Sequence, residues 1–261
     1  MTGLPDTPPT LSRAPRGIQS IEVGGQLLHA LVNEGRALPL TELARCAGMA
    51  PAKAHPYLVS FQKVGLVEQD LDSGRYGLGP LALQMGWIGL QQVDPVRWAT
   101  PVIERLAEQT LMTAALAVWG NQGATLVRLA HAPTPVHVAM RHGTVMGVSE
   151  TATGRLFAAL LPTEVLQRTL GPKTARQVQS SLSAELEAIR QSDMARVDDT
   201  VVNGVSALAA PVRDAQGELV LSLTLIGPGA TLASREGGAI PGLLQQEAAA
   251  LSARLGWRAR A

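Results

Sequence analysis

The sequence predicts an α+β protein in which a small helical part precedes a larger part of antiparallel strands and helices. Apolar residues recur at helical spacing through residues 18–64. Beyond residue 110, short strand-like runs alternate with turn residues and further helical segments, a pattern typical of antiparallel sheets packed against helices. Hydrophobic residues make up 46% of the 261 residues and charged residues 16%. This composition supplies a packed core and argues against a disordered chain.

Charge, cysteine content and the N-terminus restrict the class of protein. The formal net charge of +1 excludes a strongly cationic protein, and the single cysteine, Cys46, excludes an internal disulfide and fits a reducing cytoplasm. Residues 1–17 contain four prolines and no apolar stretch, so we expect a flexible arm and not a secretory signal. No apolar run approaches the roughly 18 residues needed to cross a bilayer. We therefore expect a cytoplasmic protein with no membrane partner.

Helical spacing of apolar residues predicts three helices in the first third of the chain. The expected helices cover residues 18–34, 41–47 and 51–64. Gly48 follows the second helix, and Pro51 suits the first position of the third. Residues 66–78 hold two short extended segments around a turn, which predicts a hairpin. This order over residues 18–79 indicates a winged helix-turn-helix.

Three residues weaken the predicted helices. Gly24 and Gly25 each cost roughly 1 kcal/mol relative to alanine in the first helix, so packing must hold it. Pro56 removes the backbone donor to Ala52 in the third helix and can cost roughly 3 kcal/mol in a helix interior. We expect that helix either to be kinked at Pro56 or to begin late.

Residues 80–93 predict a helix between the two parts. This segment is apolar on most sides, and a helix of that kind must be buried. Its position makes it a candidate for burial against a second copy of the chain, so we expect a linker that also dimerises. Asp94 as cap and Pro95 as first residue mark the start of the next helix.

Residues 94–261 predict a second domain. The expected strands cover residues 112–119, 124–130, 136–141, 206–213 and 218–226. The expected helices cover residues 151–161, 183–191 and 233–256, the last interrupted at Pro241-Gly242. Turn residues at 120–123 and 214–217 predict hairpins. Antiparallel hairpins with helices before, between and after them indicate an α+β sensor-type domain.

Several short motifs occur in a fixed order along the chain. They are Leu43-Ala44 with Gly48-Met49, residues 65–70 with 74–79, Thr151-Ala152-Thr153-Gly154-Arg155, residues 204–212, and Leu225-Ile226-Gly227-Pro228. In this order and spacing they resemble the IclR family of bacterial transcription regulators, from about residue 18 to residue 257. The resemblance implies a winged helix-turn-helix, a linker helix and a GAF-like α+β ligand-sensing domain. It also implies a homodimer or homotetramer that binds operator DNA, with no catalytic activity and no cofactor.

The third helix of such a domain enters the major groove and reads base edges. The candidate DNA-contacting residues are Pro51, Ala52, Lys53, His55, Tyr57 and Ser60 on that helix and Arg75 on the wing. Lys53 can contact phosphate or guanine, and His55 a base edge. Residues 1–80 contain seven Lys or Arg and seven Asp or Glu residues, so one copy should bind weakly and two or more copies should act together. A small helical domain that binds a protein is the plainer alternative.

Pro56 departs from the family pattern, because relatives usually carry a phosphate-contacting arginine at that position. It puts the base-reading geometry of the third helix in question, but not the type of domain. A second function is therefore kept: a small-molecule-binding regulator with impaired DNA reading that acts through protein partners.

Residues 151–154 open a helix, and the free amides and dipole of a helix start attract a carboxylate or phosphate. Ordinary capping by a threonine is the plainer explanation. In IclR relatives small organic acids bind between this helix start and the facing sheet. The resemblance places the effector against Met146, Ala152, Thr153, Gly154, Asp198, Ala207, Thr224 and Ile226, with Val197 competing for the position of Asp198. Because Ala207 and Ile226 replace cysteine and serine of relatives, we expect an apolar pocket and an aromatic or aliphatic acid.

Other signals do not support an enzyme or a metal site. Residues 204–208 begin like a nucleophile elbow but lack its closing glycine. Asp198 and Asp199 are adjacent, so on a strand they point to opposite faces and cannot share a substrate. The spacings of His131, His137 and His142 fit no standard zinc pattern.

Overall fold

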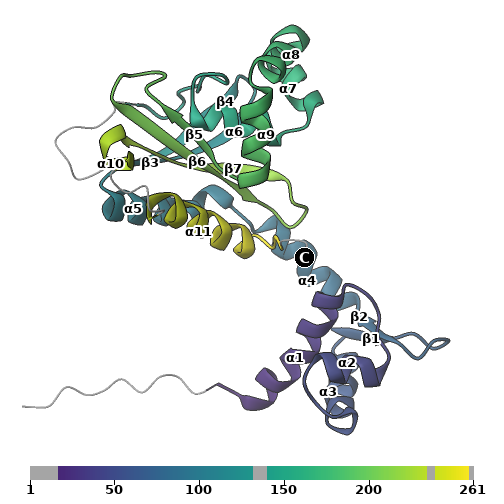
Figure 1. The fold of residues 1–261 in the computed structure, drawn as a ribbon. Coiled ribbons are helices and arrows are strands. Elements are labelled where there is room, and N and C mark those ends of the chain that lie inside the picture. The colour runs from purple at the N-terminus through teal and green to yellow at the C-terminus, as the bar shows by residue number, and fades with distance from the viewer. Residues whose placement is uncertain (1–16, 132–139, 234–238, 259–261) are drawn as a thin grey trace, which may run out of the picture. The chain divides into compact units, whose positions relative to one another are not determined.

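The computed structural model describes residues 17–131, 140–233 and 239–258, which divide into two compact units (Figure 1). The first unit ends at Gln92 and the second begins at Val93. None of the helices in the described ranges combines the length and hydrophobicity that a bilayer crossing requires.

The first unit has the order helix, helix, helix, hairpin, helix. Its elements are α1 (Gln19–Glu34), α2 (Leu40–Cys46), α3 (Pro51–Lys63), β1 (Val67–Gln69), β2 (Tyr76–Leu78) and α4 (Pro80–Gln91). Gly48 adopts a positive φ of 67° between α2 and α3, a backbone conformation that favours glycine. Strands β1 and β2 pair antiparallel, and Leu38 adds a bridge to Tyr76. This arrangement confirms the predicted winged helix-turn-helix.

One expectation about the helices of this unit is wrong in detail, and one alternative for the third helix is excluded. Helix α2 begins at Leu40, one residue early, because Pro39 and not Thr41 precedes its first turn. Helix α3 begins at Pro51 and continues through Pro56 to Lys63, so a late start is excluded. Proline at the first helical position costs nothing, since that amide has no partner within the helix.

Helices α1 and α3 approach each other most closely at Gly24. A Cβ atom at Gly24 would lie 2.9 Å from Tyr57 Cδ1 and 3.0 Å from Phe61 Cζ, whereas one at Gly25 would meet nothing within 4 Å. Tyr57 is therefore half-buried against α1 and the core around Leu27 and does not stand on the exposed face of α3. The expectation that Tyr57 is exposed is wrong for this reason, and its contact with DNA stays a prediction.

Helix α4 exposes the apolar side chains that the sequence predicts to be buried. Leu83 is 76% exposed and Trp87 66%, and Met85 and Ile88 are also exposed. The start of α4 packs against the end of α3, where the Leu81 amide donates to the Gly65 carbonyl. Within the chain the predicted burial is absent, and burial against a second copy stays a prediction.

The second unit is built on one sheet. Its strands are β3 (Thr113–Gly120), β4 (Gly123–Ala130), β5 (Ala195–Asp198), β6 (Val205–Arg213) and β7 (Leu219–Pro228). The sheet order is β4-β3-β7-β6-β5, with every neighbour antiparallel. Residues 143–146 lie along the free edge of β4, where the Met146 amide donates to the Ala124 carbonyl at 2.7 Å.

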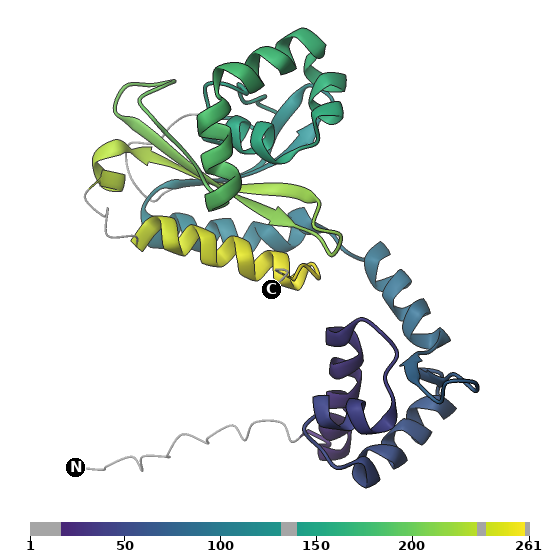
Figure 2. The same ribbon diagram turned by 45° about the vertical axis from the view of Figure 1, so that its right-hand side comes forward.

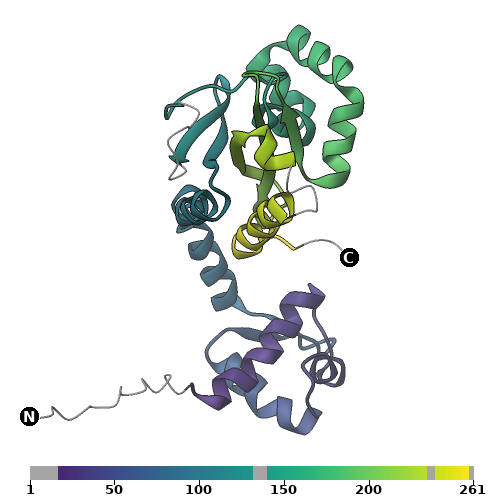
Figure 3. The ribbon, with the colours of Figure 1, turned by 60° about the vertical axis from the view of Figure 1, so that its left-hand side comes forward.

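Helices cover both faces of this sheet. They are α5 (Pro95–Thr110), α6 (Ala152–Leu160), α7 (Thr163–Leu170), α8 (Pro172–Ser181), α9 (Ser183–Ser192), α10 (Gly229–Ala233) and α11 (Ala239–Arg254). Helices α5 and α11 lie side by side on one face, and α6 and α9 lie on the other (Figures 1 and 3). Strand β7 serves both layers: Leu221, Leu223 and Leu225 enter the α5–α11 core, while Thr224 and Ile226 face the opposite layer. The α+β class is confirmed.

Sequence patterns missed or misplaced some elements of the second unit. Sequence patterns did not predict helices α7 and α8 or strand β5. Helices α7 and α8 lie on the same side of the sheet as α9 (Figure 2). Pro241 does not interrupt α11, because it lies in the first turn. The expected strand at 136–141 falls largely on residues 132–139, outside the described residues, and Met140 and Arg141 form no strand.

Candidate functional sites

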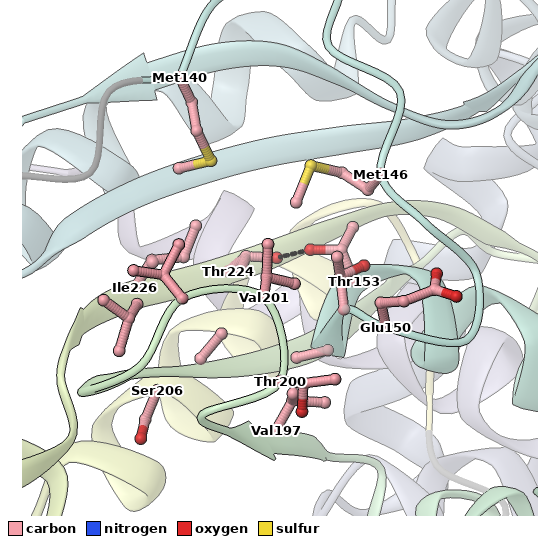
Figure 4. A pocket seen from close by; sticks show the side chains of 15 residues that line it. Met140, Met146, Glu150, Thr153, Val197, Thr200, Val201, Ser206, Thr224 and Ile226 are labelled. Atoms are coloured by element: carbon pink, nitrogen blue, oxygen red, sulfur yellow. Dashed lines mark hydrogen bonds between the residues drawn. The ribbon is translucent and has the colours of Figure 1, made fainter.

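A cavity opens between the start of α6 and the facing sheet (Figure 4). Its volume, including the mouth, is about 510 Å³. It is lined by Met140, Met146, Glu150, Thr151, Ala152, Thr153, Val197, Thr200, Val201, Val202, Val205, Ser206, Ala207, Thr224 and Ile226. Nine of these fifteen side chains are apolar, and no Lys, Arg or His is among them.

Thr151 holds the start of α6 in place. Its Oγ1 accepts from the Gly154 amide at 2.9 Å and donates to the Gly147 carbonyl at 2.8 Å, while its own carbonyl accepts from the Arg155 amide. This is the ordinary capping that the sequence allowed. Because the cap engages residues 154 and 155, it leaves the amides of Ala152 and Thr153 as donors at the positive end of the helix dipole.

Gly154 serves packing at this helix start and does not line the cavity. A Cβ atom at Gly154 would clash with the Gly147 carbonyl oxygen and lie 2.6 Å from Val148 Cα. Only glycine lets the loop before α6 lie this close to the helix. The predicted effector contact at Gly154 stays a prediction.

A buried pair of hydroxyl groups crosses from α6 to the sheet. Thr153 Oγ1 lies 2.9 Å from Thr224 Oγ1, and both side chains are almost fully buried (Figure 4). A hydrogen bond between two hydroxyls uses one of their two protons. The pair therefore retains one proton to donate.

Six of the eight predicted effector residues line the cavity: Met146, Ala152, Thr153, Ala207, Thr224 and Ile226. Asp198 does not, and Val197 takes the position instead, because neighbouring residues of β5 point to opposite faces. The Asp198 carboxylate accepts from Arg196 Nε at 2.9 Å. Partial burial raises its pKa, but hydrogen bonds from Ser206 and Arg196 outweigh burial and hold the pKa of Asp198 below its ordinary value.

The loop between β5 and β6 contributes side chains that sequence patterns missed. Asp199 has a positive φ of 55°, and its Oδ1 accepts from the Gly204 amide at 2.6 Å. The loop carries Val201 and Val202 to the cavity, although Val201 is 66% exposed. The adjacent Val201 and Val202 could have pointed to this site, because turns are seldom built from β-branched apolar residues.

The exposed face of α3 carries little charge. Pro51, Ala52, Lys53, His55, Pro56 and Ser60 are exposed. Ser60 Oγ donates to the Pro56 carbonyl at 3.0 Å. On the wing, Arg75 Nη1 donates to the Ala37 carbonyl at 3.3 Å, so this side chain lies back against its own domain.

The Arg36 side chain also has a partner within the protein. Its Nη2 lies 2.7 Å from Glu42 Oε1, and this hydrogen bond raises the pKa of Arg36 and lowers that of Glu42. The described residues contain no group of three His, Cys, Asp or Glu side chains that could hold a metal ion. His137, one of the three histidines considered for a metal, lies outside them.

Family models match both units. The IclR helix-turn-helix model matches residues 20–71, and the model described as bacterial transcriptional regulator IclR C-terminal matches residues 89–253. The chain belongs to the IclR family. It is a DNA-binding transcriptional regulator with a C-terminal ligand-binding domain, and its relatives are regulators and not enzymes.

Individual relatives agree with this assignment. The glycerol operon regulatory protein of Streptomyces griseus is 31% identical over 218 residues, covering 82% of this chain and 86% of the relative. Its counterpart in Streptomyces coelicolor is 30% identical over 204 residues, covering 76% and 80%. The crystal structure of HmgR from Pseudomonas aeruginosa superposes with a TM-score of 0.86 at 32% identity, covering 93% of this chain and all of that one.

Proposed function

We propose that this IclR-family regulator binds operator DNA as a homodimer or homotetramer and is controlled by a small organic acid with an aromatic or aliphatic body. The observation that carries the proposal is the apolar cavity at the capped start of α6. In this proposal residues 18–79 bind DNA, residues 80–93 link and dimerise, and residues 94–261 bind the effector. Such a protein acts where the DNA is, in the cytoplasm.

The lining of the cavity supports an acid with an apolar body. The amides of Ala152 and Thr153 lie where a carboxylate gains from the helix dipole, by typically 0.3–1 kcal/mol and up to about 2 kcal/mol when partly buried. Met140, Val201 and Ile226 offer apolar surface to the remainder of the ligand (Figure 4).

A polyol fits this cavity less well. Two relatives regulate glycerol operons by their names, so glycerol is the natural competitor. Each buried hydroxyl without a partner costs roughly 1–3 kcal/mol, and the Thr153–Thr224 pair offers few partners. We therefore expect acids with apolar bodies to bind more tightly than glycerol.

Exposed apolar residues on α4 support the proposed self-association. Leu83, Met85, Trp87 and Ile88 are each more than half exposed in one chain. A contiguous apolar patch of this kind marks an interaction site. The neutral charge balance of residues 1–80 adds a second reason, because paired DNA-binding domains compensate for weak single contacts.

The continuous α3 bears on the competing function. A helix disrupted at Pro56 would impair DNA reading, but α3 runs unbroken from Pro51 to Lys63. We therefore favour operator binding over action through protein partners alone.

The ligand is tested by thermal unfolding of the full chain with paired compounds: benzoate and benzamide, hexanoate and hexanamide, and glycerol. A ligand at 100 times its Kd stabilises by about 2.7 kcal/mol, which corresponds to a rise in Tm of about 5–10 °C for a domain of this size. The acids should bind up to about 30-fold more tightly than their amides, because only the acids carry charge to the start of α6.

Two matched variants locate the binding. Ala207→Leu fills the cavity and should abolish the shift, while Ala184→Leu on the exposed side of α9 should retain it. Equal shifts in both variants would place the ligand elsewhere. The DNA half of the proposal is tested by binding of the full chain to its own upstream DNA over a range of salt concentrations, with and without the acid.

A further inference from the structure

The outward face of α3 is suited to read an apolar feature of DNA. We propose that Ala52 and Pro56 recognise the 5-methyl groups of thymines in the major groove, so that the operator half-site is defined in part by thymine positions. This inference rests on the proposed operator binding and specifies its chemistry.

The phase of α3 places these two residues at the centre of the outward face. Its inward side is set by Ala54 and Leu58, which are fully buried. With 3.6 residues per turn, Ala52 and Pro56 lie almost opposite them, and both are exposed. Lys53 falls on one flank of this face and His55 on the other.

The centre of this face has little capacity for hydrogen bonding. The Ala52 side chain has no polar atom, and Pro56 has neither a polar side chain nor an amide proton. Ser60, the next exposed residue along the helix, already donates its proton to the Pro56 carbonyl at 3.0 Å. A base edge pressed against Ala52 and Pro56 thus meets carbon and no free side-chain donor.

Only one base presents an apolar group there. In the major groove guanine, adenine and cytosine offer donors and acceptors, whereas thymine adds its 5-methyl group beside O4. A donor or acceptor desolvated against carbon loses its water partners without compensation. A methyl group against carbon gains from the same desolvation, so the apolar centre of α3 selects thymine.

Pro56 makes no contribution to the fold that would explain it. Its ring is exposed and absent from the hydrophobic core of the first unit, and it removes an amide donor from the middle of α3. What the ring adds is rigid apolar surface one helical turn from Ala52. Two described arginines of the first unit already have partners, Arg36 in Glu42 and Arg75 in the Ala37 carbonyl.

The test begins with the full chain and a pool of duplex DNA of random sequence, from which the tightest-binding duplexes are enriched. The best duplex is then resynthesised with single thymines replaced by deoxyuridine, which deletes only the methyl group. Burial of one methyl group corresponds to about 0.8 kcal/mol, a factor of about four in Kd. We expect at least one thymine in each half-site to show this loss.

Protein variants assign the methyl contact to α3. Ala52→Gly and Pro56→Gly should each bind the thymine and deoxyuridine duplexes with nearly equal affinity at the thymine that the removed side chain contacts, because the apolar partner of that methyl group is gone. Ala184→Gly, the same change as Ala52→Gly on an exposed helix of the second unit, should keep the fourfold ratio.

The outcomes separate this inference from the proposed function. Tight, sequence-specific binding that is insensitive to deoxyuridine, or a fourfold ratio that survives in both α3 variants, would overturn the thymine reading and leave operator binding intact. Failure to enrich any duplex would overturn operator binding itself, and the thymine reading with it.

Discussion

The close approach of α1 and α3 can be tested with two neighbouring glycines of one helix. Gly24 and Gly25 both lie inside α1, and alanine at either position improves helix propensity by about 1 kcal/mol. At Gly25 the new Cβ meets nothing within 4 Å, so Gly25→Ala should raise the free energy of opening by about that amount. At Gly24 the Cβ meets two aromatic rings.

The expected cost at Gly24 follows from these contacts. The Cβ would lie 2.9 Å from Tyr57 Cδ1 and 3.0 Å from Phe61 Cζ, closer than carbon atoms normally pack. Both rings pack against the core of the first unit, so they can withdraw only by moving α3 or their neighbours. Overpacking of this kind costs about 1–3 kcal/mol. Gly24→Ala should therefore be less stable than Gly25→Ala by that difference, since the propensity gain is common to both.

Native-state hydrogen exchange of the α1 amides, followed by NMR, measures this difference within the first unit alone. A gap of 1–3 kcal/mol corresponds to exchange rates that differ by about 5- to 150-fold. The amides of Leu27 and Leu31 are suited to this measurement because their side chains are buried in the core. If Gly24→Ala slowed exchange as much as Gly25→Ala, α1 and α3 could not approach as closely as described.

Three further predictions concern assembly, DNA contact and pH. Trp87→Glu should weaken self-association by more than 100-fold, because a carboxylate replaces an apolar contact; analytical ultracentrifugation measures this, and an unchanged mass would exclude α4 from the interface. Lys53→Ala and Arg75→Ala should each lower the salt slope of DNA binding by about 1 per bound copy, and unchanged slopes would remove both from the phosphate contacts. Ser206→Ala should raise the pKa of Asp198 in an NMR titration, since it removes a hydrogen bond that lowers this pKa. Because the pKa of Asp198 is depressed in the folded state, its carboxylate stabilises the protein above the unfolded pKa of about 3.9. That stabilisation is lost as pH falls through the folded pKa. An unchanged pKa of Asp198 in the variant would contradict the role of Ser206.

Local sequence signals were enough to predict those elements whose ends are fixed by residues a few positions away in the chain. Asp94 caps α5 by accepting from the Arg97 amide, and Thr151 caps α6. The hairpin between β6 and β7 turns at Gly217, with Asp214 accepting from the Glu218 amide. Each of these could be predicted because a short polar side chain or a glycine satisfies a need of the backbone nearby.

Features that depend on packing between distant segments could not be predicted in this way. Val197 and not Asp198 faces the cavity because β5 pairs with β6 in one register, which the sequence of β5 alone leaves open. Tyr57 points inward because Gly24, more than thirty residues earlier, leaves room for its ring. Helix α7 buries only Leu166, and α8 only Ala175 and Val178, so their apolar spacing was too sparse to stand out.

Strand β7 separates the cavity at the start of α6 from the α5–α11 core by a single layer of backbone. Thr224 and Ile226 border the cavity on one side, while Leu223 and Leu225 between and beside them pack among the side chains of α5 on the other. Three residues separate the end of α4 from the start of α5, so α5 is the covalent route to the DNA-binding unit. A ligand that shifts β7 even slightly must therefore be felt on the far side of the sheet, because a close-packed interior has no slack in which to absorb the displacement. In the proposed function, the sheet transmits ligand binding in the cavity to helix α5.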